Sequence, residues 1–192
     1  MKLILSSSST ARRQLMQRTQ YPFDVFHPDI DETLLENEAI EKAVERLARG
    51  KAHAAKDAYP NALIIGCDQL LSVNNVILGK PHTHERAVAQ LSQCSNQLLH
   101  SYTGIALLNS QTGTIQTDVI TYQVKFKELS QSLIERYLHK DKPYQCAGSI
   151  KAESMGFTLF SWTRGDDINA LIGLPLIRLN EMLLNEQVDI TL

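Results

Sequence analysis

The sequence has few cysteines and no long apolar run. Its three cysteines, Cys67, Cys94 and Cys146, are far apart and form no Cys-x-x-Cys pair, which favours neither a disulfide framework nor a zinc knuckle. No stretch approaches the roughly 18 apolar residues of a membrane-spanning helix, and the N-terminus lacks the pattern of a secretory signal. We therefore expect a soluble, cytoplasmic protein with no membrane partner.

An excess of charge of one sign is also missing. The chain has 19 Lys and Arg against 21 Asp and Glu, a formal net charge of -2, so it has no general electrostatic field for nucleic acid. We expect no nucleic-acid partner, and any site for anions must be local. The 192 residues, of which 43% are hydrophobic, suffice for one sizeable core, and we predict a single domain over residues 1–192.

Predicted strands and helices alternate along the chain. Short apolar runs predict strands at 2–5 and 62–67. Two alternating runs, 98–109 and 115–127, are separated by a good hairpin loop. This order predicts an α/β fold with a mixed, twisted sheet flanked by helices.

Helices are predicted from apolar residues at helical spacing and from capping residues. Asn37 is expected to cap a long helix, and the aromatic side chains of Phe157, Phe160 and Trp162 are expected to fill core. The expected helices are 10–19, about 38–58, 84–94, 130–139 and one after Pro175, with a further strand near 157–162.

A carboxylate follows the most apolar of the short strands. Residues 63–65 indicate a buried strand, and we expect Gly66 to turn the chain at its end, so that Asp68 emerges where ligands meet strand termini. Lys80, in Gly79-Lys80-Pro81, places an ammonium at the next break in the chain. A carboxylate and an ammonium placed in this way are typical of a site that cleaves phosphate bonds, where Asp68 can hold a metal or take a proton from water.

The segment from residue 5 to residue 13 offers hydroxyl groups and backbone amides at the start of a helix. The helix dipole favours an anion there, and Arg12 and Arg13 add positive charge. A solvated loop with a serine cap and two surface arginines explains the same residues, and both interpretations stay open. The chain has no Gly-x-x-x-x-Gly-Lys-Ser/Thr pattern, which argues against a P-loop nucleotide motor.

Lys51 lies on the inward side of its predicted helix. It follows Leu47 by four residues and precedes Ala54 by three, which puts an ammonium on the apolar stripe. An inward cation usually meets an anion. The alternative is a lysine whose stem lies on the core while its tip reaches water.

Residues 29–33 (Asp-Ile-Asp-Glu-Thr) concentrate three carboxylates. Carboxylate oxygens and water are the natural ligands of magnesium or manganese that holds a polyphosphate. The same residues spell the Asp-x-Asp-x-Thr pattern of haloacid-dehalogenase-type phosphatases. His27-Pro28 interrupts the preceding apolar run, however, whereas those enzymes place the pair at a strand end. An exposed acidic loop is the simpler interpretation of Asp29.

Short motifs occur in a fixed order along nearly the whole chain. They are Leu3 to Arg12, Glu32, Arg46-Leu47-Ala48 with Lys51, Gly66-Cys67-Asp68, Lys80-Pro81, Thr103-Gly104, Ala147-Gly148 and Gly173-Leu174-Pro175-Leu176. Taken in order, these residues resemble the Maf family of nucleoside-triphosphate pyrophosphatases. The resemblance implies a mixed α/β fold with two lobes and a central cleft, related to that of inosine-triphosphate pyrophosphatases. It also implies hydrolysis of a nucleoside triphosphate to the monophosphate and pyrophosphate with a divalent cation such as Mg²⁺, Mn²⁺ or Co²⁺.

The resemblance also implies roles for individual residues. Carried over by position, Asp68 is the general base, and Glu32 and Asp68 hold the metal. The phosphate-binding residues are Ser7, Arg12, Lys51 and Lys80.

Three positions bear on the choice of base. Gln69 and Glu153 look like the family branch that prefers 7-methyl-GTP, whereas Ala11 stands where that branch typically has tryptophan. Guanine methylated at N7 is positively charged, so a carboxylate at Glu153 favours it and can accept hydrogen bonds from its N1-H and 2-amino groups. The resemblance therefore implies a 7-methyl-GTP pyrophosphatase.

Other functions remain open from the sequence. They are a dTTP or UTP pyrophosphatase of the same family, a nucleotide-responsive regulator of septum formation without significant turnover, and a phosphomonoesterase that uses Asp29. The oligomeric state is open as well, a homodimer included.

Overall fold

The computed structural model describes residues 1–191 and contains two compact units. The first unit comprises residues 1–69, 102–120 and 167 onward, and the second comprises 70–101 and 121–166. Two units agree with the two lobes that the family resemblance implies. The single domain predicted over 1–192 stays a prediction.

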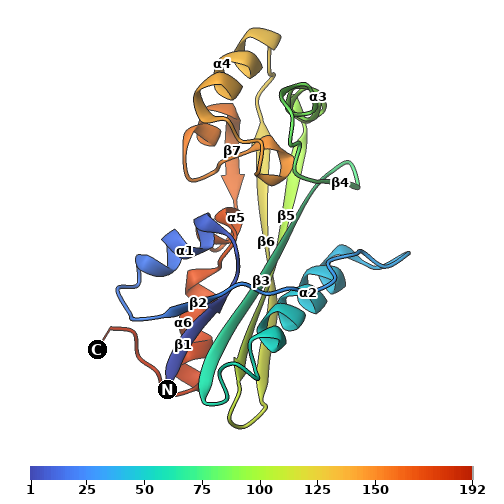
Figure 1. Ribbon diagram of the computed structural model, residues 1–192. Coiled ribbons are helices and arrows are strands. Elements are labelled where there is room, and N and C mark those ends of the chain that lie inside the picture. The colour runs from blue at the N-terminus through green and yellow to red at the C-terminus, as the bar shows by residue number, and fades with distance from the viewer. Residues whose placement is uncertain (192) are drawn as a thin grey trace. The chain divides into compact units, whose positions relative to one another are not determined.

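Three strands contribute residues to both units, and the other elements each belong to one (Figure 1). The shared strands are β3 (Ala62–Val73), β5 (Leu98–Asn109) and β6 (Ile115–Phe126). The first unit adds β1 (Lys2–Ser6), α1 (Thr10–Gln17), β2 (Asp24–Phe26), α2 (Ile40–Ala54), α5 (Ile168–Ile172) and α6 (Leu176–Asn185). The second adds β4 (Val76–Leu78), α3 (His84–Cys94), α4 (Gln131–Asp141), β7 (Phe160–Arg164) and the 3₁₀ segments Ala147–Ser149 and Met155–Leu159.

The strands form a mixed sheet, as the sequence predicts. Within residues 1–191 the sheet has seven strands in the order β2-β1-β3-β5-β6-β7, and β4 pairs with β3. β1 runs parallel to β2 and β3, whereas β4 is antiparallel to β3 and β7 is antiparallel to β6. The hydrogen bond from Asn109 N to Thr114 O (2.9 Å) closes the predicted loop between β5 and β6. The predicted α/β class is confirmed.

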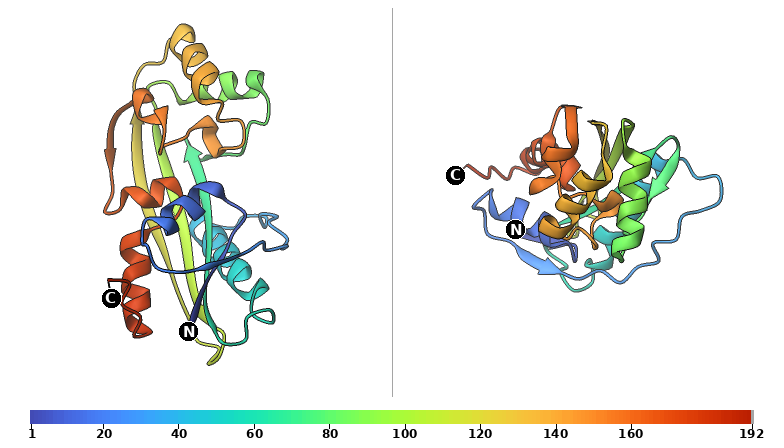
Figure 2. Two further views of the ribbon diagram at one scale, coloured as in Figure 1. Left: turned by 60° about the vertical axis from the view of Figure 1, so that its left-hand side comes forward. Right: turned by 90° about the horizontal axis from the view of Figure 1, so that it is seen from above.

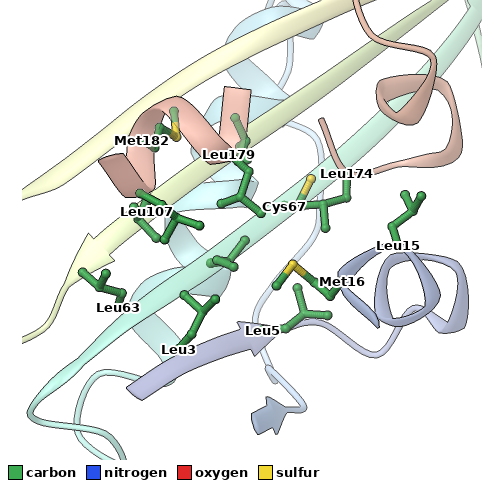
Figure 3. Close-up of a cluster of buried hydrophobic side chains, with 13 residues drawn as sticks. Leu3, Leu5, Leu15, Met16, Leu63, Cys67, Leu107, Leu174, Leu179 and Met182 are labelled. Atoms are coloured by element: carbon green, nitrogen blue, oxygen red, sulfur yellow. The ribbon is translucent and has the colours of Figure 1, made fainter. Parts of the chain in front are cut away.

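In the first unit, the two faces of the sheet carry separate apolar clusters because side chains alternate along each strand. One face packs against α1 and α6 through a cluster that includes Leu5, Ile65 and Leu107 (Figure 3). The other face packs against α2 through Ile4, Ile64 and neighbouring side chains. Figure 2 shows α6 and α2 on opposite sides of these strands.

Two glycines let α2 lie close to the sheet. A Cβ at Gly66 would lie 2.1 Å from Ala48 O, and a Cβ at Gly104 would lie 2.2 Å from Val44 O. Gly66 therefore does not turn the chain at the end of a strand as predicted, because β3 continues through it to Val73. The expectation that Asp68 follows a strand end was wrong for the same reason, and Asp68 lies inside β3.

The N-terminus of α2 also differs from the prediction. Its N-cap is Ala39, which makes no side-chain capping bond, and the helix ends at Ala54 instead of Ala58. Asn37 lies outside the helix with φ 59°. Asparagine tolerates the left-handed region better than most residues, so it serves the turn before the helix.

In the second unit, the aromatic side chains lie at the surface more than predicted. Phe157 is 63% exposed and Trp162 is 46% exposed, so both core predictions were wrong. Phe160 is half-buried and packs edge-to-face on Phe126, with ring centroids 5.6 Å apart.

Predicted helices at 84–94 and 130–139 correspond to α3 and α4. In the part of the chain that the structure describes, none of the helices has the length and apolar character needed to cross a bilayer.

Candidate active site

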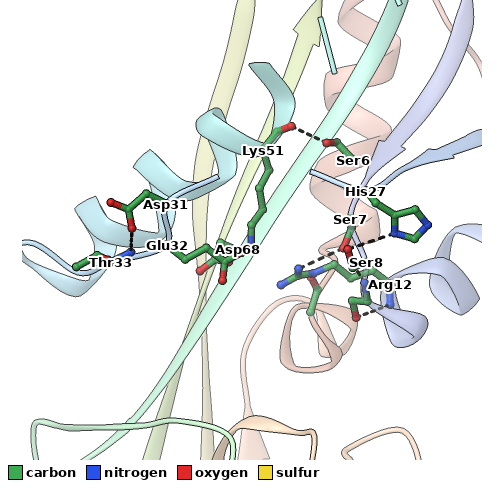
Figure 4. Close-up of polar contacts among 12 residues, drawn as sticks. Ser6, Ser7, Ser8, Arg12, His27, Asp31, Glu32, Thr33, Lys51 and Asp68 are labelled. Carbon is green, nitrogen blue, oxygen red and sulfur yellow. Dashed lines mark hydrogen bonds and ion pairs between the residues drawn. The ribbon is translucent and has the colours of Figure 1, made fainter. Parts of the chain in front are cut away.

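The centre of the candidate site is the ammonium of Lys51. Lys51 Nζ lies 2.5 Å from Asp68 Oδ1 and 2.7 Å from Glu32 Oε1 (Figure 4). The side chains of Lys51 and Asp68 are only 8% and 11% exposed, whereas that of Glu32 is 60% exposed. The anion that the inward position of Lys51 called for is therefore present, and it consists of two carboxylates.

Local structure explains why these groups meet. Ile64, Gly66 and Asp68 alternate onto the face of β3 that packs against α2. Because Gly66 lets the backbone of α2 come close, the next inward side chain of α2 reaches Asp68. Ser6 Oγ donates a hydrogen bond to Lys51 O at 2.6 Å, which ties the end of β1 to the same turn of α2.

Glu32 comes from the exposed acidic loop between β2 and α2. Of the three carboxylates predicted there, only that of Glu32 forms an ion pair with Lys51 in the described residues. Asp31 caps its own loop: its Oδ1 accepts a hydrogen bond from Thr33 N at 2.9 Å, and the bonds from Thr33 lower the pKa of Asp31. Asp29 is exposed and lies three residues beyond the end of β2.

The predicted anion-binding residues of the N-terminal segment lie together at the start of α1. Ser7 Oγ accepts hydrogen bonds from Ser9 N (3.2 Å) and from Arg12 Nη1 (3.5 Å). Arg12 Nε donates to Gly173 O at 2.7 Å, which fixes the guanidinium plane. Ser9 is the N-cap of α1 and accepts from Arg12 N. Ala11 is half-buried on the first turn of the helix.

Charges of both groups act on the thiol of Cys67. The thiol is fully buried, and burial raises the pKa of Cys67 to about 11, although the positive charges of Arg12 and Lys51 act in the opposite direction. The negative charge of Asp68 adds to the increase. Cys67 Sγ donates to Gly173 O at 3.0 Å, the carbonyl that Arg12 also contacts. The raised pKa keeps the Cys67 thiol protonated between the two groups' charges at neutral pH.

Gln69 lies on the face of β3 opposite to Asp68. Its Nε2 donates to Ala170 O (2.8 Å) and Leu171 O (2.9 Å), in the last turn of α5, and lies 3.2 Å from Thr103 Oγ1. Thr103 Oγ1 donates to Ala170 O as well, at 2.8 Å. Gln69 therefore holds the C-terminus of α5. The C-cap of this helix is Gly173, whose carbonyl oxygen orients Arg12.

The other two predicted site residues, Lys80 and Glu153, belong to the second unit, and both are exposed. The charges of both residues act on the thiol of Cys146, whose pKa is raised first by burial and then by Glu153, and is lowered by Lys80. The backbone of the Lys80 loop is held by a bond from Gly148 N to Gly79 O at 3.2 Å.

Sequence reasoning missed several residues that organise these groups. Asp167 is 4% exposed and caps two helices, since its carboxylate accepts from Asn169 N of α5 and from Ile177 N of α6. An aspartate before a helix is a general capping signal, which could have indicated Asp167. Asp141 was missed as well, because its partners Ser154 and Met155 belong to a later segment and no local pattern indicates them.

The family model for Maf-like proteins matches residues 2–186 of the chain. A protein of Pseudomonas savastanoi pv. phaseolicola named 7-methyl-GTP pyrophosphatase is 50% identical over 98% of each chain. Proteins with the same name from Methylobacillus flagellatus and Pseudomonas putida are 48% and 50% identical, over 98% and 97% of each chain. A solved structure of the Staphylococcus aureus Ham1 protein aligns with a TM-score of 0.46 at 14% identity, covering 67% of this chain and 73% of that chain.

Proposed function

Because the chain belongs to the Maf family, we propose that it is a 7-methyl-GTP pyrophosphatase that releases 7-methyl-GMP and pyrophosphate, and so removes a modified nucleotide from the cytoplasmic pool. Relatives of nearly equal length and about half identical sequence carry that name. The structural observation that supports it best is the cluster of Lys51 with Asp68 and Glu32, a nearly buried cation shared by two carboxylates.

Asp68 is the proposed general base. Water attacks the α-phosphorus, a new O–P bond forms, and the bond from the α-phosphorus to the bridging oxygen breaks as pyrophosphate leaves. The Asp68 carboxylate accepts the proton of the attacking water. Lys51, which is 2.5 Å away, fixes the orientation of this carboxylate.

Ser7 and Arg12 are proposed to bind phosphate at the start of α1. Arg12 Nε donates a hydrogen bond to Gly173 O, and this bond fixes the plane in which the two outer guanidinium nitrogens lie. The helix dipole and the backbone amides of the first turn favour negative charge at the same place. In the second unit, Lys80 is proposed to bind phosphate and Glu153 to favour the cationic base.

The residues of the cluster fit a divalent cation. A cation, the Lys51 ammonium, already lies within hydrogen-bond distance of two carboxylate oxygens. No larger group of His, Cys, Asp and Glu suited to a metal occurs among residues 1–191. Glu32 and Asp68 would therefore hold the ion with water and substrate phosphate, as is usual for Mg²⁺. When bound, Mg²⁺, Mn²⁺ or Co²⁺ supplies charge that stabilises the phosphate oxygens in the transition state.

A substrate panel tests the proposal. Release of pyrophosphate is measured with 7-methyl-GTP, GTP, dTTP and UTP under identical conditions, and the nucleotide product is identified. We expect the highest kcat/KM with 7-methyl-GTP and a monophosphate product. A clear preference for dTTP or UTP would reject the base assignment. Release of inorganic phosphate would indicate a phosphomonoesterase, and binding without turnover would indicate a regulatory protein.

A further inference from the structure

A short loop of the second unit, residues 151–156, is held by one buried aspartate. We name it the Glu153 loop, because Glu153 is its exposed acidic residue. Asp141, the last residue of α4, is 8% exposed. Its carboxylate accepts hydrogen bonds from Ser154 Oγ at 2.6 Å and from Met155 N at 3.2 Å.

The first residue of the Glu153 loop is fixed to the same helix. Lys151 Nζ donates to the backbone oxygen of Asp141 at 2.5 Å, and Lys151 N donates to Tyr137 Oη at 3.0 Å. Burial raises the pKa of Tyr137, and the negative charge of Asp141 acts in the same direction, so the phenol stays protonated. Both ends of the segment that carries Glu153 are therefore bonded to α4.

The loop also closes on itself. Ser154 N and Gly156 N both donate to Lys151 O, at 3.2 Å and 2.9 Å. A Cβ at Gly156 would lie 2.5 Å from Lys151 O, so only glycine permits this turn. With its backbone closed and its flanks bonded, the loop has little freedom to move Glu153.

Glu153 differs from its neighbours because the described structure gives it no hydrogen bond or ion pair of its own. Its charge instead acts on the thiol of Cys146, together with the charges of Lys151, Asp141 and Lys80. Asp141 thus carries the anchoring bonds, and Glu153 is left to interact with a ligand.

We propose that Asp141 is a positioning residue for base recognition: its carboxylate orders the Glu153 loop, and this order sets the preference for a cationic purine over a neutral one. The inference rests on the proposed function, in which Glu153 favours the positively charged 7-methylguanine. Loss of the anchor keeps the Glu153 carboxylate but lets it occupy a wider range of positions, which weakens its attraction to a charge at one point.

The test compares kcat/KM for 7-methyl-GTP and for GTP in the wild type, Asp141→Asn, Glu153→Gln and the double variant. Asp141→Asn replaces one of two acceptors, and we expect the 7-methyl-GTP to GTP ratio to fall about three- to tenfold, the range expected for releasing one ordered side chain. Glu153→Gln should remove most of the preference. The double variant should have the ratio of Glu153→Gln alone, because both substitutions act through the same carboxylate.

Glu128→Gln is the matched control, because it makes the same carboxylate-to-amide change at an exposed position of the second unit. It should keep the wild-type ratio. If Asp141→Asn does not fold, Ser154→Ala decides by the same ratio, since it removes one anchoring bond and no charge.

The outcomes separate the two proposals. A wild-type ratio in Asp141→Asn overturns the positioning role but leaves the proposed 7-methyl-GTP activity intact. The same holds for a wild-type ratio in Ser154→Ala if that variant is used instead. Equal reduction of both kcat/KM values overturns it too, since that indicates a general structural role. A wild-type protein without preference for 7-methyl-GTP, or a Glu153→Gln variant that keeps the preference, instead refutes the proposed base recognition itself.

Discussion

Asp68 of the first unit and Asp141 of the second are equally buried aspartates with opposite kinds of partner. Asp68 is 7% exposed and pairs with the ammonium of Lys51, which it shares with Glu32. Asp141 is 8% exposed, and its carboxylate accepts from a hydroxyl group and a backbone amide. A side-chain cation can be drawn away by a phosphate or replaced by a metal, whereas a neutral hydroxyl group and a backbone amide cannot. The difference suits Asp68 to chemistry and Asp141 to holding a loop.

The largest expected effect is on turnover. Asp68→Asn should reduce kcat about 10²- to 10⁴-fold, the usual contribution of a general base, while nucleotide still binds. Initial rates of pyrophosphate release and equilibrium binding of a nucleotide measure the two quantities separately. Asp57→Asn, at an exposed position of the same unit, is the control and should leave both unchanged. Near-normal turnover in Asp68→Asn would exclude Asp68 as the base.

The next effect concerns stability. Lys51→Met leaves the nearly buried Asp68 carboxylate without its cation, which should lower the free energy of unfolding by about 3–5 kcal/mol. Added Mn²⁺ should stabilise this variant more than the wild type, because a divalent cation can take the place of the ammonium between the carboxylates. Urea unfolding with and without Mn²⁺ measures both changes. An unchanged unfolding curve would mean that the pair of Lys51 and Asp68 does not stabilise the fold.

A smaller effect should appear at high pH, at the thiol beside Asp68. Burial raises the pKa of Cys67 to about 11, whereas an unfolded thiol has a pKa of about 8.5. Between these values the unfolded chain releases its proton first, so the stability is full below about pH 8.5 and falls as the pH rises toward 11, by an amount on the order of 2–3 kcal/mol. Cys67→Ser, whose hydroxyl can still donate to Gly173 O, should lack this loss. Parallel stability curves for wild type and Cys67→Ser from pH 7 to 10.5 would contradict the assignment.

The smallest effect should come from an exposed ion pair in the same unit. Lys2 Nζ lies 3.4 Å from Asp24 Oδ2, and the two side chains are 72% and 53% exposed. Lys2→Met should change the free energy of unfolding by less than about 1 kcal/mol, because solvent screens such pairs. The same urea titration that is used for Lys51→Met makes the comparison direct. A loss as large as that of Lys51→Met would show that burial does not distinguish the two lysines.

Much of the fold follows from local patterns. Helices α3 and α4 and the long strands β5 and β6 lie within a few residues of their predicted bounds, since apolar periodicity and caps such as Ser130 act over short distances. The helical spacing of Lys51 likewise indicated an inward ammonium with an anion to meet. The prediction that Asn37 caps α2 was wrong because Asn37 adopts a left-handed backbone conformation before the helix, which no periodicity reveals.

The geometry of the site could not be predicted, because it depends on contacts between residues that are distant in sequence. The residue types at 51 and 68 were apparent from the sequence, but only the tertiary structure placed Asp68 inside β3, opposite the turn of α2 that Gly66 admits. The amide of Gln69 points to the other face and bonds α5, which itself was not predicted.

The sequence by itself determined the alternation of strands and helices, the two faces of the sheet and the identity of the charged groups, because each depends on neighbours along the chain. The tertiary structure alone decided which carboxylate meets Lys51 and which one anchors the Glu153 loop. Those choices depend on the packing of segments that are distant in sequence. Alternation along a strand sets the face on which a side chain lies, but only packing brings its partner within hydrogen-bond distance.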